Sequence, residues 1–195
     1  MMDYCEIIFR CVLIVLMIYY VFKRKFKILK TITLVFVLSF LSVFLNAVFQ
    51  VKVDAFSNFL YLTVIFSSLY LGSSLGFYDK YKWWDRLIHL LSGIGFVGFG
   101  NAIVNAASTD INKPGILIFG FTFSITLHVF WEVLEYISDC LSHGNAQRWQ
   151  KVNAAKNHMP EGALQPAGLV DTMNDTICCI VGAGLAVIAW YITVS

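Results

Sequence analysis

The sequence predicts an all-α protein, a polytopic bundle of about six transmembrane helices that forms a single domain over residues 1–195. Two features of the composition carry this prediction. The chain is 58% hydrophobic and only 13% of its residues are charged, whereas a soluble domain of this size has about 25% charged residues. The apolar residues also come in long blocks, without the short-period alternation of a soluble core. The composition therefore indicates an integral membrane protein.

Six apolar blocks approach or exceed the roughly 20 helical residues needed to cross about 30 Å of hydrocarbon. We expect these helices over about residues 7–22, 31–50, 57–77, 85–107, 115–140 and 171–193. The first block follows acidic residues, precedes a basic cluster and has no small-residue cleavage site, so we expect a retained helix and not a signal peptide. The long loop over residues 141–170 fits either a cap over a site or a plain linker.

The basic residues predict the orientation of the bundle. Of the fourteen lysines and arginines, eleven fall in the first, third and fifth loops between the predicted helices. Because short cytoplasmic loops carry an excess of Lys and Arg, these loops are predicted to be cytoplasmic and both termini extracytoplasmic. The net charge is only +2, and we expect no nucleic-acid partner.

A polar stripe interrupts the fifth predicted helix. His128, Glu132, Glu135 and Asp139 are separated by four, three and four residues, which places them within an arc of roughly 60° on one helix face. A charge at the centre of a bilayer costs on the order of 3 kcal/mol or more, so acidic residues inside a membrane normally face the bundle interior and serve a function.

Two further helices begin with polar pairs of the same kind. Asp85 and His89 open the fourth predicted helix, and Asp171 and Asp175 open the sixth, each pair at a spacing of four residues. With the orientation given above, the fourth and sixth helices leave the cytoplasm where the fifth returns to it. The three polar stripes are therefore predicted to meet at one level, near the cytoplasmic surface.

Six of the twelve acidic residues belong to this constellation. So many facing carboxylates repel one another unless several carry protons or cations bind among them. Histidine and carboxylate side chains together supply the nitrogen and oxygen ligands of zinc, manganese or iron, and helical bundles build carboxylate metal sites from facing helices. The candidate metal ligands are His89, His128, Glu132, Glu135 and Asp175.

Simpler roles remain open for individual residues. Asp85 and Asp171 also suit the N-caps of their helices, and Asp139 also suits a solvated position at the membrane surface. A single histidine on an apolar helix is more often a hydrogen-bonded core residue than a metal ligand. Glu132, Glu135 and Asp175 fit such roles least well.

The motifs resemble the YjdF-like family of bacterial inner-membrane proteins of unassigned function, over roughly residues 78–184. They are Asp85-Arg86-x-x-His89-x-x-x-Gly93, then Trp131-Glu132-x-x-Glu135 with Asp139, then Gln165 and Asp171-Thr172-Met173-x-Asp175. The resemblance implies a multi-pass protein of the bacterial inner membrane. It implies motif roles for Asp85, His89, Glu132, Glu135, Gln165, Asp171 and Asp175, but no reaction; His128 comes from spacing alone.

The leading hypothesis is a metal-dependent hydrolase or transferase that acts on a lipid or lipid-linked substrate at the cytoplasmic leaflet. The candidate catalytic carboxylates are Asp85, Asp139 and Asp171, and the candidate substrate-binding residues are Arg86 and Gln165. A bound metal would polarise a carbonyl or phosphoryl group and activate water, and a carboxylate would act as general base. The sequence contains no phosphate-binding loop of the G-x-x-x-x-G-K-[ST] type.

Two alternatives come from other classes. The same carboxylates and histidines would also suit a cation or proton transporter, but a transport path needs polar groups in the outer half of the bundle as well. The polar residues there are Asn46, Gln50, Asn101 and Asn105, which form no ladder of carboxylates. A scaffold whose buried polar network only fixes helix packing is the third possibility.

Overall fold

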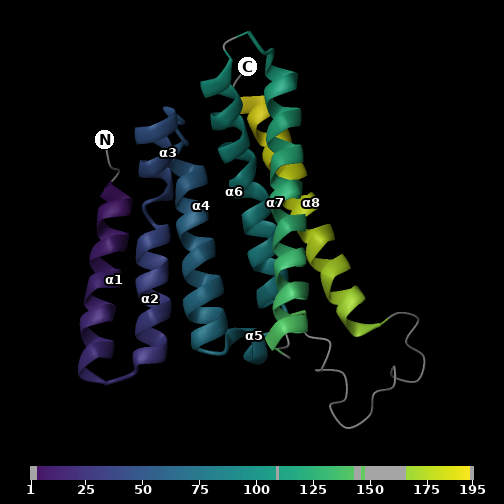
Figure 1. Cartoon of the computed structure of the whole chain (residues 1–195). Helices are drawn as coiled ribbons and strands as arrows, with labels where there is room; N and C mark the ends of the chain where they lie inside the picture. The colour runs from purple at the N-terminus through teal and green to yellow at the C-terminus, as the bar shows by residue number, and fades with distance from the viewer. Residues whose placement is uncertain (1–3, 109, 143–145, 148–165, 194–195) are drawn as a thin grey trace.

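The computed structural model describes residues 4–108, 110–142, 146–147 and 166–193. In this part of the chain the secondary structure is entirely helical, and the long helices run up and down beside one another (Figure 1). The elements are α1 (Tyr4–Phe22), α2 (Phe26–Leu38), α3 (Leu41–Phe49), α4 (Ala55–Ile65), the π-helix η1 (Phe66–Ser74), α5 (Phe77–Lys80), α6 (Trp84–Ala107), α7 (Lys113–Ser142) and α8 (Ala167–Thr193).

Six helical segments are long and apolar enough to cross a membrane, which confirms the predicted transmembrane bundle. α2 and α3 together form the second span, and α4 and η1 form the third. The last helix begins at Ala167, a turn before the predicted start near residue 171. α1 begins and α8 ends at the same end of the bundle (Figure 1), as an even number of spans requires. The assignment of this end to the outside remains a prediction from the loop charges.

A buried polar network surrounds the break in the second span. The side chain of Arg10 in α1 donates to the carbonyl oxygen of Ser39, at 2.7 Å, and to its hydroxyl, at 3.2 Å. The guanidinium lies 4.2 Å from the centre of the Phe40 ring and 3.2 Å from the carboxylate of Glu6, which also accepts a hydrogen bond from Asn58. Arg10 thus donates a hydrogen bond to a backbone carbonyl group at the break in the helix, and backbone groups inside a membrane need such partners.

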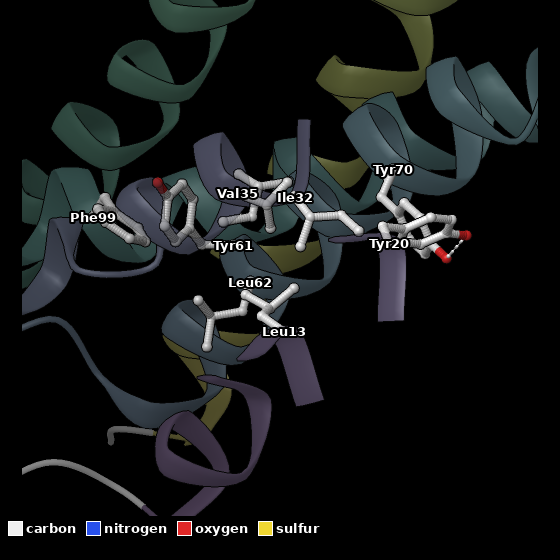
Figure 2. Close-up of a cluster of buried hydrophobic side chains, with 9 residues drawn as sticks. Leu13, Tyr20, Ile32, Val35, Tyr61, Leu62, Tyr70 and Phe99 are labelled. Atoms are coloured by element: carbon white, nitrogen blue, oxygen red, sulfur yellow. Dashed lines mark hydrogen bonds between the residues drawn. The ribbon is translucent and has the colours of Figure 1, made fainter. Parts of the chain in front are cut away.

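The N-terminal helices share an apolar core formed by α1, α2, α4 and η1, to which Phe99 of α6 also contributes (Figure 2). Leu13, Ile32 and Val35 are fully buried there. Tyr20 and Tyr70 pack edge to face, and their hydroxyls share a hydrogen bond of 2.9 Å (Figure 2). The two phenols therefore satisfy each other within apolar surroundings.

α6 lies at the centre of the bundle and packs against α4, α7 and α8. Glycines set its distance from α8. A Cβ atom at Gly93 would overlap the backbone of Cys179, and one at Gly182 would overlap the backbone of Leu90. Because the two helix backbones touch at this crossing, side chains one turn away from it are also brought face to face.

Candidate metal centre

His89 lies at the centre of the polar residues that meet inside the bundle. It precedes Gly93 by one helical turn, about 6 Å from the crossing of α6 and α8. Its Nε2 atom lies 3.6 Å from Asp85 on α6, 3.9 Å from Glu132 on α7 and 3.9 Å from Asp175 on α8. All four side chains are buried. Three helices thus direct one carboxylate each toward a single imidazole nitrogen.

The orientation of His89 is set by a second histidine. The Nδ1 atoms of His89 and His128 lie 3.2 Å apart, and the Nε2 atom of His128 lies 2.9 Å from the hydroxyl oxygen of Thr176. That hydroxyl donates its own hydrogen to the carbonyl oxygen of Thr172 at 2.7 Å. Thr176 must therefore accept a hydrogen bond from His128, whose Nε2 carries the proton.

This chain of hydrogen bonds assigns the tautomers. Since a neutral imidazole has one donor and one acceptor nitrogen, Nδ1 of His128 accepts from Nδ1 of His89. The remaining nitrogen of a neutral His89, Nε2, then presents a lone pair to three carboxylates. Such an arrangement is repulsive unless a proton or a cation sits among these atoms.

The distances agree better with a cation than with direct hydrogen bonds. Separations of 3.6 to 3.9 Å exceed the usual hydrogen-bond range of about 2.7 to 3.2 Å. Two ligands of a tetrahedral zinc ion, each about 2.1 Å from the metal, lie roughly 3.4 Å apart. The same atoms form groups compact enough to hold an ion: Asp85, His89 and Asp175, and His89, His128 and Glu132.

Glu132 supplies an independent sign of a missing partner. Its Oε1 atom is buried and makes no hydrogen bond, although it lies 3.7 Å from Nε2 of His128 and 3.9 Å from Nε2 of His89. A buried carboxylate oxygen without a hydrogen-bond partner is costly, and a cation bound beside it would offset that cost. The oxygen faces the nitrogen atom to which the other carboxylates point.

The structure separates the other predicted site residues from this centre. Glu135 accepts a hydrogen bond from the Trp131 indole at 2.7 Å and lines a neighbouring cavity. Asp139 lies two turns beyond Glu132 and accepts hydrogen bonds from the backbone N–H groups of residues 146 and 147. Asp139 therefore fixes the turn that follows α7, a role distinct from both metal binding and simple solvation.

The remaining predicted residues lie near the mouth of the bundle. Asp171 is half-buried one turn before Asp175, and Arg86 is exposed beside Asp85. Gln165 falls outside the described residues. The N-cap alternative is wrong for both aspartates: the N-cap of α6 is Trp83, and α8 begins four residues before Asp171. Asp85 instead occupies the first turn of α6, where the helix dipole favours an acidic side chain.

Thr176 is a hydrogen-bond partner of His128 that the sequence pattern did not indicate. It follows Asp175 directly and contributes only a hydroxyl to an apolar helix, so the sequence pattern did not mark it as part of the site. A threonine in such a helix commonly bonds to the carbonyl four residues back, as Thr176 does. Its role depends on His128 of another helix, which spacing along one helix does not reveal.

Comparisons with known proteins place the chain in a family without an assigned activity. An uncharacterised protein of Thermotoga maritima is 25% identical over 119 residues, which cover 60% of this chain and 53% of that relative. The chain thus matches about half the length of that relative. No solved structure matches. The family model described as "Predicted membrane protein (DUF2238)" matches residues 5–195, so the chain belongs to this family of membrane proteins.

Proposed function

We propose that this multi-pass membrane protein is a metal-dependent enzyme, a hydrolase or transferase whose substrate is a lipid or lipid-linked molecule. The observation that carries the proposal is the position of the His89 Nε2 atom, which faces the carboxylates of three helices at 3.6 to 3.9 Å. A network that served packing alone would bring the His89 Nε2 atom within hydrogen-bond distance of at least one of these carboxylates.

The proposed metal ligands are His89, Asp85, Glu132 and Asp175. One nitrogen and several carboxylate oxygens suit zinc, manganese or iron. His128 holds the His89 ring in place through the shared Nδ1 hydrogen bond, the kind of support that metal-binding histidines usually have. When bound, the metal would polarise a carbonyl or phosphoryl oxygen and make a water molecule acidic enough to attack it.

Glu135 is the best-placed proton acceptor. It lies three residues from Glu132 and lines a cavity that also reaches Asp85, so a substrate in that cavity would lie between the metal ligands and Glu135. Asp139 suits this task less well, because both of its oxygens accept backbone hydrogen bonds. Asp171 is proposed to support Asp175 from the entrance of the site.

The membrane setting favours a lipid substrate. The centre lies within the last turns of α7 and the first turns of α6 and α8, at the end of the bundle that holds the turn between α1 and α2 (Figure 1). With the predicted orientation, this is the cytoplasmic end. The resemblance to the YjdF-like family supports a bacterial inner membrane, where Arg86 would contact anionic head groups of the surrounding leaflet.

A transporter made from the same residues is supported less well. A polar cavity of about 240 Å³ does lie toward the opposite end of α6, with Asp54, Asn101 and Asn105 in its wall. Between that cavity and His89, however, Val97 and Ala183 are completely buried in an apolar cluster with Ile94 and Phe121. The described residues therefore place a dry layer between the two polar regions.

Metal content tests the proposed centre. The full chain is purified in detergent without chelators, beside His89→Ala and Glu132→Ala, and its metals are measured by mass spectrometry. Asp139→Asn is the matched control, because it removes a nearby carboxylate outside the proposed ligand set. We expect about one transition-metal ion per wild-type and Asp139→Asn chain, and loss from the two ligand variants.

The opposing result is equally clear. A folded wild-type protein that holds no metal, even after dialysis against zinc, manganese or iron, would contradict the metalloenzyme proposal. Proton uptake or cation flux in liposomes would then test the transporter. Retention of metal by both ligand variants would place the ion elsewhere in the chain.

A further inference from the structure

Two adjoining cavities lie between η1 and α7, beside the proposed metal centre. The first, about 500 Å³, is lined by polar and apolar residues, most of them in η1, α5, α6 and α7, and we call it the polar cavity for its carboxylates and hydroxyls. The second, about 330 Å³, is lined mainly by apolar residues of α4, η1, α6 and α7. Both include Ser68, Leu69, Tyr78, Trp131 and Leu134. We call the pair the lateral groove.

Two histidines line the apolar cavity. Val64, Ile65, Phe96 and Leu127 contribute to its wall, and His89 and His128 lie in the same wall. Its volume falls within the range of small-molecule sites, about 300 to 1,000 Å³. A molecule in this cavity would therefore bring one end of an apolar chain to the proposed reacting centre.

The groove opens toward the lipid. On α7, Phe130, Trp131 and Leu134 line the apolar cavity and are also 63%, 43% and 58% exposed. These side chains lie in a membrane-spanning helix, so the medium they contact is the bilayer. A ligand can thus enter from the side without leaving the membrane.

The opposite wall is a π-helix. The ring of Tyr78 packs where a Cβ atom at Gly72 would lie, and the Ser68 and Tyr78 hydroxyls share a hydrogen bond of 2.7 Å. π-Helical segments are rare, and those inside α-helices frequently mark functional sites. η1 directs Ser68, Gly72 and Ser73 into the groove.

The residues that line the polar cavity indicate which chemical groups a ligand could place there. Asp79, Asp85 and Glu135 line it together with the hydroxyls of Ser73 and Ser138, and its described lining contains neither lysine nor arginine. Carboxylates and hydroxyls favour a ligand that donates hydrogen bonds and disfavour a phosphate or carboxylate. Lys80 and Arg86, which directly follow Asp79 and Asp85, are exposed and do not line the cavity.

We propose that the lateral groove binds a lipid from the side, with a hydrocarbon chain in the apolar cavity and a donor-rich, non-anionic head group in the polar cavity. The head group is a polyol or an amine. This inference rests on the proposed function, because it places the bond joining head and chain beside His89. It names the substrate class and its route of entry.

Photo-crosslinking in nanodiscs tests the chain site with the full-length protein. The probe is a dodecylamine that carries a diazirine in its chain, and cross-linked residues are mapped by tandem mass spectrometry. We expect labels on Val64, Phe96 and Leu127. Val64→Trp and Leu127→Phe, which fill the apolar cavity, are expected to lower this labelling at least about tenfold.

The matched control is Ile118→Trp, on the lipid face of α7 and 65% exposed. It adds the same bulk away from the groove and is expected to leave labelling unchanged. Folding of each variant is checked by gel filtration, and the two cavity variants serve as independent tests. Labels spread evenly over exposed residues, or full labelling in both folded cavity variants, would overturn the chain site.

Competition identifies the head group. Unlabelled dodecylamine and dodecyl glycerol ether are expected to displace the probe at concentrations about tenfold lower than dodecyl phosphate requires. If dodecyl phosphate competes as well as the other two, the head-group assignment is wrong. All arms are repeated after chelation and in His89→Ala. A folded wild-type protein that binds no metal but is still labelled at the cavity residues would contradict the proposed enzyme and leave the lateral groove supported.

Discussion

Two buried polar clusters in this protein differ in how they are satisfied. In the N-terminal half, Glu6 and Arg10 form an ion pair, and Asn58 and Ser39 supply further hydrogen bonds. In the C-terminal half, the contacts of His89 Nε2 with three carboxylates are all longer than hydrogen bonds. The first cluster holds helices together, whereas the second is the one that we propose to hold a metal ion.

This difference suggests a structural role for the Glu6–Arg10 cluster and a functional role for the cluster around His89. A buried charge that meets its partner directly is accounted for by the fold. Oε1 of Glu132 and Oε2 of Glu6 both lack a hydrogen bond, but Oε2 of Glu6 has the Arg10 guanidinium at 3.2 Å, whereas Oε1 of Glu132 faces two histidine nitrogens at 3.7 and 3.9 Å. The comparison predicts that substitutions in the two clusters have opposite consequences.

Arg10→Met is expected to have the largest effect on stability. It leaves the carboxylate of Glu6 buried without its cation, which typically costs about 3 to 5 kcal/mol. The free energy of unfolding in mixed micelles measures the loss. The double variant Glu6→Gln/Arg10→Met removes both charges and is expected to recover most of it. A single variant as stable as wild type would show that the pair does not hold α1 to the break after α2.

Glu132→Gln is expected to act in the opposite way. The metal-free protein should be as stable as wild type or more so, because a buried, unpaired carboxylate is replaced by an uncharged amide. Metal affinity should fall at least about a hundredfold, corresponding to about 2.7 kcal/mol. Equilibrium dialysis and unfolding with and without chelator measure the two quantities. A large loss of stability in the chelated variant would instead assign Glu132 a structural role like that of Glu6.

Thr176→Val tests the support of the histidine pair with a smaller expected effect. Without the hydroxyl, Nε2 of His128 loses its acceptor and the tautomer of His89 is no longer fixed. Loss of such an outer partner typically lowers metal affinity about 10- to 100-fold. Thr176→Ser keeps the hydroxyl and is the matched control. Equal metal affinities for the valine and serine variants, measured by dialysis, would rule out the hydrogen-bond chain.

Tyr20→Phe is expected to have the smallest effect. It removes the hydroxyl bonded to Tyr70, and a hydrogen bond within a membrane protein averages only about 0.6 kcal/mol. The expected change in unfolding free energy is below about 1 kcal/mol, with metal content unchanged. A loss of metal in this variant would mean that the two halves of the bundle are coupled, contrary to the comparison.

The sequence predicted the six spans because a membrane helix needs a long apolar block, which composition displays directly. It also predicted that His89, Glu132 and Asp175 meet, because helical periodicity and span direction place them on inward faces at one level. Asp139 was grouped with them although it lies about 10 Å further along the helix. Helical periodicity predicts which face of a helix a residue occupies, but it does not predict which residues of other helices it will contact at that depth.

Other features had no local signal. The pairing of Glu6 with Arg10 follows the four-residue spacing, but the break at Ser39 that Arg10 satisfies depends on packing between α1 and α2. The π-helix likewise begins inside a continuous apolar block. The wider turn of the π-helix is explained by a tertiary contact: the ring of Tyr78 packs against Gly72, where a Cβ atom would overlap it.

X-ray absorption by the metal-loaded protein tests the central claim most directly, because it reports the atoms around the ion. With zinc, the proposed centre predicts only nitrogen and oxygen ligands at about 2.0 to 2.2 Å. It also predicts that zinc forced onto His89→Ala by excess metal shows no imidazole scattering. A sulfur ligand at about 2.3 Å would place the metal on a cysteine instead. A spectrum unchanged by His89→Ala would show that the ion does not bind where the three carboxylates meet.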